Sequence, residues 1–354
     1  MGTPAFLPLA ALSIAVLLSP AWAQTAGPLV SNSVVIASGN LPESSTPRNV
    51  NEWLMRMHDA SSRRAYVGTF VVSSALGNLS TSRIWHVCDG EQQMERVDAL
   101  SGVPRTTLRR NENVLTFLPG LRLARSEKRD SFGMFPNLLR TGDSSIAEFY
   151  SAKVVASDRA AGYDADVVQI TPKDKLRFGY RIWSEKKSGL VIKLQTLDTD
   201  GRVIEQSAFS ELQLDAPVKM DKLAQMMANT EGYRVEKSEV VKTTPASEGW
   251  SLKAAVPGFQ SISCFKRPVD PRQPAVAGNA LQWVFSDGLA TVSMFLEIYD
   301  RQRHMNESLQ VLGATQSLTR RWADKDGEWW VTVLGEVPAP TLLAFVQSLE
   351  RKKP

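Results

Sequence analysis

The sequence predicts a mainly β (α+β) protein of two domains, a larger one followed by a smaller one. Its 354 residues exceed the about 100 to 150 residues of a typical domain. Segments in which apolar and polar residues alternate recur along the chain, and turn pairs such as Asp-Gly separate them, which is typical of antiparallel hairpins. The clearest helical periods lie near the two ends of the folded part, so helices are expected to flank the sheets.

The first 23 residues are typical of a secretory signal peptide. A mostly apolar stretch from Ala5 to Leu18 precedes a small-residue site, which predicts cleavage between Ala23 and Gln24. This stretch is shorter than the about 20 residues of a membrane-spanning helix. It lacks a preceding Lys or Arg, which either a longer leader upstream or a retained interfacial anchor would explain. We therefore expect an exported protein with a flexible leader over residues 24–48.

A first amphipathic helix is expected from residue 50 to about Arg63. Asn49 can cap it, and Glu52 stands three residues later, as in a capping box. One face is apolar at the spacing of an α-helix, through Val50, Trp53, Leu54 and Met57. These residues are expected to anchor the helix in a core.

After this helix the period changes from 3.6 to 2, which predicts strands. The first two strands are expected around Tyr66–Val72 and Ser82–Cys88. A three-strand antiparallel meander is expected over residues 178–184, 190–197 and 202–214, because turn sequences rich in Gly, Asp, Lys and Ser join these segments. Residues 130–150 have no strand period and are expected to form a helix or loop at one mouth of a curved sheet.

A polar interval divides the two domains. We expect the large domain over residues 49–218, a linker over 219–248 with a short helix near its start, and the small domain over 249–354. In the small domain, Asp287-Gly288 predicts a hairpin and Trp329–Leu334 another strand. A C-terminal amphipathic helix is expected to start at Pro340 and to have Arg351-Lys352-Lys353 as its last residues, at the negative end of the helix dipole.

The sequence contains no recognisable catalytic constellation. The nucleophile-elbow, zinc-protease, dinucleotide and P-loop patterns are absent, and the three histidines are scattered, so no enzyme activity, cofactor or metal is expected. The 41 basic and 37 acidic residues give a net charge of only +4, which argues against a nucleic-acid partner. Cys88 and Cys264 either form an interdomain disulfide or remain buried thiols. These observations favour a binding protein.

Short strings along the chain carry a family resemblance. The large domain contains Tyr66–Phe70, Ser82–His86, Gly102–Arg105 and Phe117–Gly120, and the small domain contains Val256–Phe259, Phe285–Leu289 and Val333–Pro338. In this order the strings resemble the RseB/MucB family, periplasmic regulators of the envelope-stress sigma factor. The resemblance implies a large domain similar to LolA and LppX, a curved antiparallel half-barrel with helices, and a smaller domain of a sheet and a helix.

The resemblance also implies a function. Family members bind the periplasmic segment of an inner-membrane anti-sigma factor of the RseA/MucA type and shield it from site-1 proteolysis. Lipid or lipopolysaccharide signals are expected to release that protection, and members self-associate as dimers or larger species. The expected location is the periplasm. The alternative is a periplasmic lipid or lipoprotein carrier, because a half-barrel leaves an apolar concave face.

Two groups of residues are candidates for lipid binding. The pocket candidates are Phe117, Phe132, Phe135, Leu138, Leu139 and Trp183. An ordinary place in the core is an equally good explanation for them. The candidates for contacts with lipid phosphates are Arg122, Arg125, Lys128 and Arg129. A solvated strand edge would account for these charges equally well.

Overall fold

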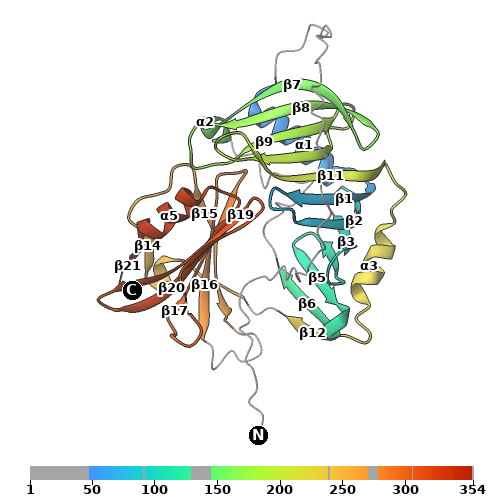
Figure 1. Ribbon diagram of the computed structural model, residues 1–354. Helices are drawn as coiled ribbons and strands as arrows, with labels where there is room; N and C mark the ends of the chain where they lie inside the picture. The colour runs from blue at the N-terminus through green and yellow to red at the C-terminus, as the bar shows by residue number, and fades with distance from the viewer. Residues whose placement is uncertain are drawn as a thin grey trace, which may run out of the picture.

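The computed structural model describes residues 48–90, 92–128, 145–237, 240–269, 278–304 and 306–352 (Figure 1). The predicted signal peptide, its cleavage between Ala23 and Gln24, and the leader up to residue 47 lie outside these ranges. Two β-rich units lie side by side, which matches the predicted fold class.

Up to the polar interval, the described residues of the large unit form two helices, one short 3-10 turn and eleven strands. They are α1 (Val50–Arg63), β1 (Tyr66–Ser74), β2 (Leu79–Cys88), β3 (Gln93–Ala99), β4 (Thr106–Arg110), β5 (Asn113–Leu118), η1 (Pro119–Leu121), β6 (Leu123–Lys128), α2 (Ile146–Phe149), β7 (Tyr150–Ala160), β8 (Tyr163–Pro172), β9 (Gly179–Glu185), β10 (Val191–Leu197) and β11 (Val203–Leu214).

One curved sheet of twelve strands forms the large unit. Its order is β12-β6-β5-β4-β3-β2-β1-β11-β10-β9-β8-β7, and the pairs from β6 to β7 are antiparallel. The predicted meander is confirmed as β9, β10 and β11. Pairing of β1 with β11 in the middle of the sheet joins the early strands to the late ones.

The capping box of α1 is confirmed. The Asn49 side chain accepts from the Glu52 amide at 3.0 Å, and the Glu52 carboxylate accepts from the Asn49 amide at 2.8 Å. The apolar face of α1 packs on strands β8, β9 and β10 through Trp53, Leu54 and Met57, which are almost fully buried. This burial fixes α1 across one face of the sheet.

The polar interval is not a linker over its whole length, which corrects the expected boundaries of 219–248. Helix α3 (Met220–Ala228) packs on β3 and β4 of the large sheet, and β12 (Arg234–Lys237) pairs with β6 as a parallel edge strand. The large unit therefore extends to Lys237. Strand β13 (Val241–Lys242) already pairs with a strand of the small unit.

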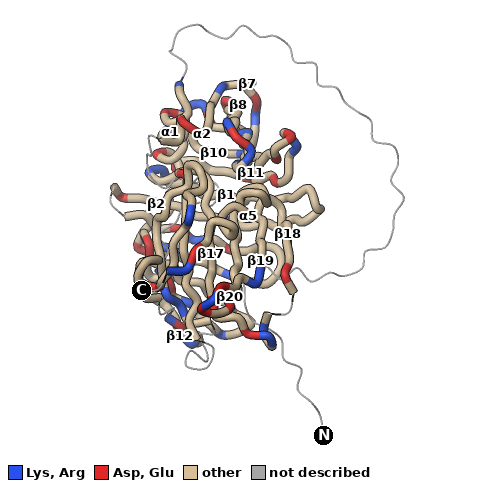
Figure 2. The backbone as a smooth tube through the Cα atoms, turned by 90° about the vertical axis from the view of Figure 1, so that its left-hand side faces the viewer, with Lys and Arg blue, Asp and Glu red and all other residues tan. Residues whose placement is uncertain are grey.

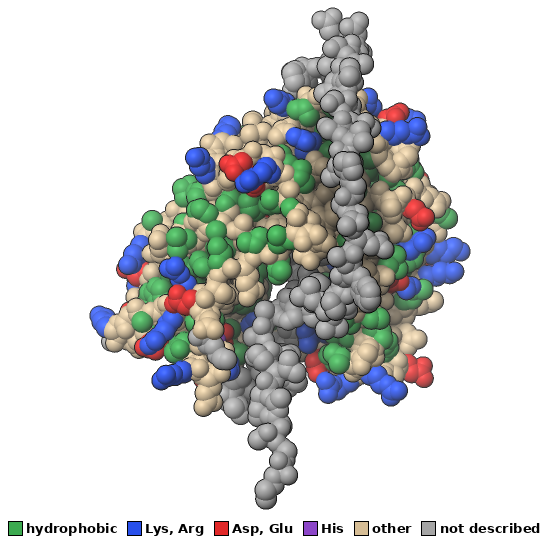
Figure 3. Space-filling view, viewed as in Figure 1, with side chains coloured by type: hydrophobic (Ala, Val, Ile, Leu, Met, Phe, Trp, Pro, Cys, Tyr) green, Lys and Arg blue, Asp and Glu red, His purple; other side chains and the backbone are tan. Residues whose placement is uncertain are grey.

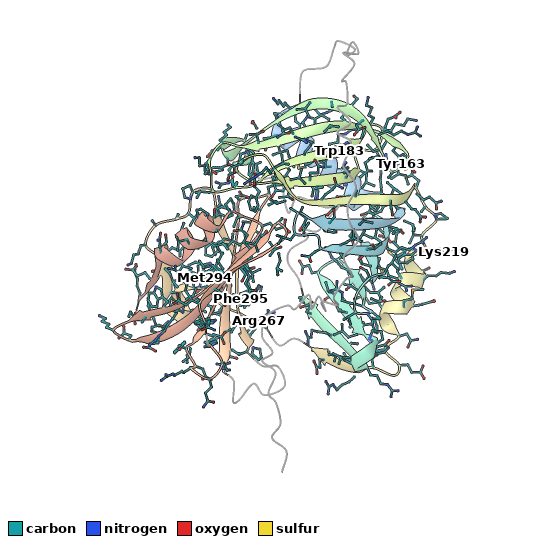
Figure 4. The ribbon with its side chains drawn as sticks, viewed as in Figure 1. Tyr163, Trp183, Lys219, Arg267, Met294 and Phe295 are labelled. Carbon is teal, nitrogen blue, oxygen red and sulfur yellow. The ribbon has the colours of Figure 1, made fainter. Side chains whose placement is uncertain are left out.

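The described part of the small unit contains a seven-stranded sheet that is covered by a helix. Its elements after β13 are η2 (Ala246–Glu248), β14 (Trp250–Leu252), β15 (Gln260–Pro268), β16 (Asn279–Ser286), β17 (Thr291–Ile298), β18 (Ser308–Leu312), β19 (Thr315–Asp324), β20 (Gly327–Gly335), α5 (Ala339–Ser348) and β21 (Leu349–Arg351). The order is β13-β15-β16-β17-β20-β19-β18, and α5 packs its Phe345 on this sheet. Met294 of β17 belongs to the same core (Figure 4).

The expected end of the C-terminal helix is wrong. Helix α5 ends at Ser348, and Leu349–Arg351 form β21, which pairs with β14. Arg351 does not cap the helix dipole, because its guanidinium lies 4.8 Å from the ring centre of Trp250 and 4.6 Å from that of Trp329. The aromatic faces attract the cation and hold the strand in place.

Charges of both signs are interspersed over both units (Figures 2 and 3). The face seen in Figure 3 also carries hydrophobic side chains between the charged ones. Among the described residues no helix is long and apolar enough to cross a membrane.

Candidate functional site at the junction of the two domains

A buried ion pair joins the large and the small unit. Arg177, in the connection between β8 and β9, and Asp287, in the turn between β16 and β17, both have fully buried side chains. The Arg177 Nε donates to Asp287 Oδ2 at 2.7 Å, and the Tyr150 hydroxyl donates to the same oxygen at 2.9 Å. Burial raises the pKa of Tyr150 well above its usual value, so this hydroxyl keeps its proton and remains a donor.

The other atoms of the Arg177 guanidinium are also bonded. One terminal nitrogen pairs with Asp174, and the other donates to the carbonyl oxygen of Pro257 in the small unit at 2.5 Å. The guanidinium carbon lies 4.4 Å from the ring centre of Phe149 and 4.9 Å from that of Phe259. A buried charge is costly unless it is paired and fully hydrogen-bonded, and this arrangement meets both conditions.

Asp287 serves two purposes at once. Its Oδ1 accepts from the amides of Leu289 and Ala290 at 3.0 and 2.7 Å, which shapes the β16–β17 turn. Its Oδ2 receives the bonds from the large unit. The turn of the small unit and the ion pair between the units therefore depend on the same side chain.

Apolar side chains interlock around this pair. Leu176 of the large unit packs against the core of the small unit, and Leu289 of the small unit packs against the core beneath α1. The Thr341 hydroxyl at the start of α5 donates to the Leu176 carbonyl at 2.7 Å. We call the group of bonded residues around this ion pair the interdomain node; it consists of Tyr150, Asp174, Arg177, Pro257 and Asp287.

A second contact between the units is acidic. The Glu205 carboxylate of β11 accepts from the Ala314 amide in the β18–β19 turn at 3.1 Å, and burial raises the pKa of Glu205. Glu336 follows β20, and its side chain is exposed on one side. Neighbouring protein groups disfavour its charged form, and the charge of Glu205 adds to this effect, so its pKa rises from 4.5 to about 7. Two carboxylates from different units thus influence each other through their charges, and they repel when both are ionised.

We expect Glu336→Gln to flatten the pH dependence of stability. Because the pKa of Glu336 is higher in the folded protein, its stabilising contribution is complete below about pH 4.5 and is lost as the pH rises through about 7. The melting temperature of the wild type should therefore fall between pH 5.5 and 8 more steeply than that of Glu336→Gln, as thermal unfolding followed by circular dichroism would show. Glu112→Gln, on an exposed turn, is the control. Parallel profiles for wild type and Glu336→Gln would contradict the expectation.

The structure does not bring the two described pocket candidates together. Phe117 on β5 packs with Leu108 and Leu115, with its ring centre 5.0 Å from that of Tyr233. Six strands separate it in the sheet order from Trp183 on β9, whose indole donates to Asp158 at 2.8 Å (Figure 4). Both side chains are buried. The other pocket candidates, Phe132, Phe135, Leu138 and Leu139, lie outside the described residues.

The described candidates for phosphate contacts lie on or just before β6, beside the edge strand β12. Arg122 and Lys128 are exposed, and Nη2 of Arg125 lies 3.9 Å from Oε2 of Glu236 on β12. Arg125 and Lys128 are three residues apart on β6, so their side chains point to opposite faces. Arg129 lies outside the described residues. Their role in lipid binding stays a prediction.

A hollow of about 380 Å³ lies elsewhere, between α3 and the large sheet. It is lined by Val67, Trp85, Arg96, Gln213, Ala216, Pro217, Val218, Lys219, Lys222, Leu223 and Met226. The sequence indicated none of these residues as a site, because they lie on five different elements and on the connection between β11 and α3.

The described residues hold no group of three or more His, Cys, Asp or Glu placed to bind a metal ion. Cys88 and Cys264 are separate thiols, and burial raises the pKa of Cys264 to about 12. His86 is buried, stacks on Tyr66 with ring centres 4.8 Å apart, and bonds the Arg64 carbonyl oxygen through Nδ1 at 2.8 Å. These contacts give His86 a structural place at the end of α1.

Comparison with known proteins covers both units. Residues 49–227 match the family model of the MucB/RseB N-terminal domain, and residues 244–350 match that of the MucB/RseB C-terminal domain. The sigma factor AlgU regulatory protein MucB of Pseudomonas aeruginosa is 28% identical over 294 residues, which are 83% of this chain and 88% of that protein. The sigma-E factor regulatory protein RseB of Escherichia coli K12 is 22% identical over 322 residues, which are 91% of this chain and 96% of that protein.

Solved structures match most of the chain. The complex of MucA and MucB from Pseudomonas aeruginosa matches with a TM-score of 0.66 and 26% identity, over 86% of this chain and 99% of that one. A crystal structure of MucB in complex with MucA(peri) matches with a TM-score of 0.64 and 25% identity, over 85% of this chain and 98% of that one. On the two family models and these relatives, the chain belongs to the MucB/RseB family.

Proposed function

We propose that this protein is a negative regulator of the envelope stress response. It binds the periplasmic segment of an inner-membrane anti-sigma factor and shields that segment from site-1 proteolysis. The observation that carries the proposal is the match of both domains, in order, to MucB solved with MucA. The relatives are named regulatory proteins of sigma factors, which supports a function by binding rather than by catalysis.

The site of action in this proposal is the periplasm. The expected signal peptide and a partner segment on the outer side of the inner membrane both support it. We further propose that lipid or lipopolysaccharide fragments weaken partner binding, and that the protein self-associates as a dimer. Release by a ligand must be reciprocal, so the partner should weaken lipid binding by the same factor.

The test is fluorescence anisotropy of the labelled periplasmic segment of the anti-sigma factor from the same genome, titrated with residues 24–354. Tight binding that weakens when lipopolysaccharide fragments are added, together with protection of the segment from site-1 cleavage, is the expected result. Absence of binding and of protection would refute the regulator. Retained lipid uptake with transfer to an acceptor would then favour the alternative, a lipid or lipoprotein carrier.

A further inference from the structure

The hollow beside α3 has a floor made by one row of side chains across four strands. Gln213 of β11 pairs with Val67 of β1, Val67 pairs with Trp85 of β2, and Trp85 pairs with Arg96 of β3. Residues in direct register point to the same face of a sheet. The floor therefore runs from an amide through two apolar side chains to a guanidinium.

This floor lies on the face of the sheet opposite to α1. Tyr66 and His86, the chain neighbours of Val67 and Trp85, face the end of α1, where they bond the carbonyl oxygens of Ser61 and Arg64. Successive residues of a strand point to opposite faces. The hollow is therefore separate from the core beneath α1. It also lies away from the small unit, since α3 flanks the outer side of the large sheet (Figure 1).

The segment from Ala216 to Met226 forms the roof. Leu223 is anchored against Val87 and Met94, which places α3 over β3 and β4. The sheet continues towards β1 and β11 beyond the helix, so the row from Gln213 to Trp85 is left only partly covered. The volume of about 380 Å³ is within the range of about 300 to 1,000 Å³ usual for small-molecule sites.

Positive charge lies at the opening of this mainly apolar hollow. Lys219, labelled in Figure 4, and Lys222 of the α3 segment are exposed. Among the described residues, neither forms an ion pair with a carboxylate. Arg96 is neutralised, because its guanidinium makes two bonds to Asp98 at 2.9 and 2.7 Å while it lies 5.0 Å from the Trp85 ring centre. The two lysines therefore remain available to an anion.

We propose that this hollow binds an amphiphile with one apolar chain and an anionic headgroup. The chain lies on Val67, Trp85 and Leu223, and the head is held by Lys219 and Lys222. A phosphate head, as in a lipid fragment, and a carboxylate head, as in a fatty acid, share this chemistry. Binding itself does not depend on the proposed regulatory function; only an effect on partner release would rest on it.

The test uses decyl phosphate below its micelle concentration, with the mature protein, residues 24–354, in a calorimetric titration without any partner. Decanoate carries the carboxylate head, and decyl maltoside carries the same chain with a neutral head. We expect the two anions to bind with one site and to outcompete decyl maltoside. Equal binding of decyl maltoside, or full displacement of decyl phosphate by inorganic phosphate, would overturn the proposal.

Variants locate the site. Val67→Trp fills the floor and Met226→Trp fills the roof, and each should abolish binding while thermal unfolding shows a folded protein. Lys219→Ala combined with Lys222→Ala should weaken decyl phosphate about tenfold. Lys153→Ala combined with Lys187→Ala, exposed positions remote from the hollow, is the matched control and should bind as the wild type does. Unchanged affinity in either folded tryptophan variant would overturn the proposed site.

Discussion

Replacing Arg177 with alanine is expected to destabilise the protein by about 3 to 5 kcal/mol and to loosen the contact between the two domains. The change leaves Asp287 buried with its charge uncompensated and removes the donor to the Pro257 carbonyl oxygen. Urea unfolding measures the loss of stability, and small-angle X-ray scattering measures whether the radius of gyration increases.

Arg202→Ala is the matched control for this variant. Arg202 also bonds two aspartates, Asp198 and Asp200, but its side chain is 74% exposed. Exposed ion pairs contribute about 0.2 to 1 kcal/mol. If Arg177→Ala lost no more stability than Arg202→Ala, the interdomain node would not hold the domains together.

Gly258→Ala is expected to disrupt the same node and to lower the free energy of unfolding by about 2 to 5 kcal/mol, through steric conflict and backbone strain. Gly258 has a φ of +79°, and a Cβ there would lie 2.1 Å from Nη2 of Arg177 and 2.8 Å from the Phe149 ring. The guanidinium cannot move aside, because its Nε is held by Asp287 at 2.7 Å. Urea unfolding is again the measurement.

Gly232→Ala separates the two causes. Gly232 has the same φ of +79°, but a Cβ there would meet no atom within 4 Å. Its substitution should cost only the backbone term of about 1 to 2 kcal/mol. The double variant Arg177→Ala/Gly258→Ala should lose less than the sum of the two single losses, since the closest clash disappears with the guanidinium and only the contact with the Phe149 ring remains. Strict additivity would argue against the proposed conflict.

The elements predicted correctly from sequence are those with local signals. The capping box at Asn49 and Glu52, the meander of β9 to β11 and the hairpin at Asp287-Gly288 each depend on residues close together in the chain. Such signals survive folding because their hydrogen bonds close within a few residues.

The errors concern partners that are distant in sequence. Strand β12 reads as part of a polar linker, yet its backbone pairs with β6, more than a hundred residues earlier. Leu349 fits the period of α5, but pairing with β14 turns the chain into a strand. Backbone pairing of this kind leaves no trace in local periodicity.

Sequence patterns do not reveal the interdomain node, for a related reason. Asp287 already has a sufficient local role as a turn residue, which hides the second role of its other oxygen. Arg177 stands in a loop segment that also contains charged residues, Asp174 and Lys175, and a basic side chain is ordinary in such a loop. The signal that could have raised suspicion is the resemblance string Phe285–Leu289, because it includes the turn itself.

The short path from β12 to β13 sets how far the domains can separate. Lys237 belongs to the large sheet and Val241 to the small one, and four Cα steps of a fully extended chain span about 14 Å. A domain released from the node therefore stays tethered near its partner surface, at an effective concentration of the order of millimolar. Reclosing after such a release would be a first-order event that dilution does not slow, whatever the cellular abundance of the protein.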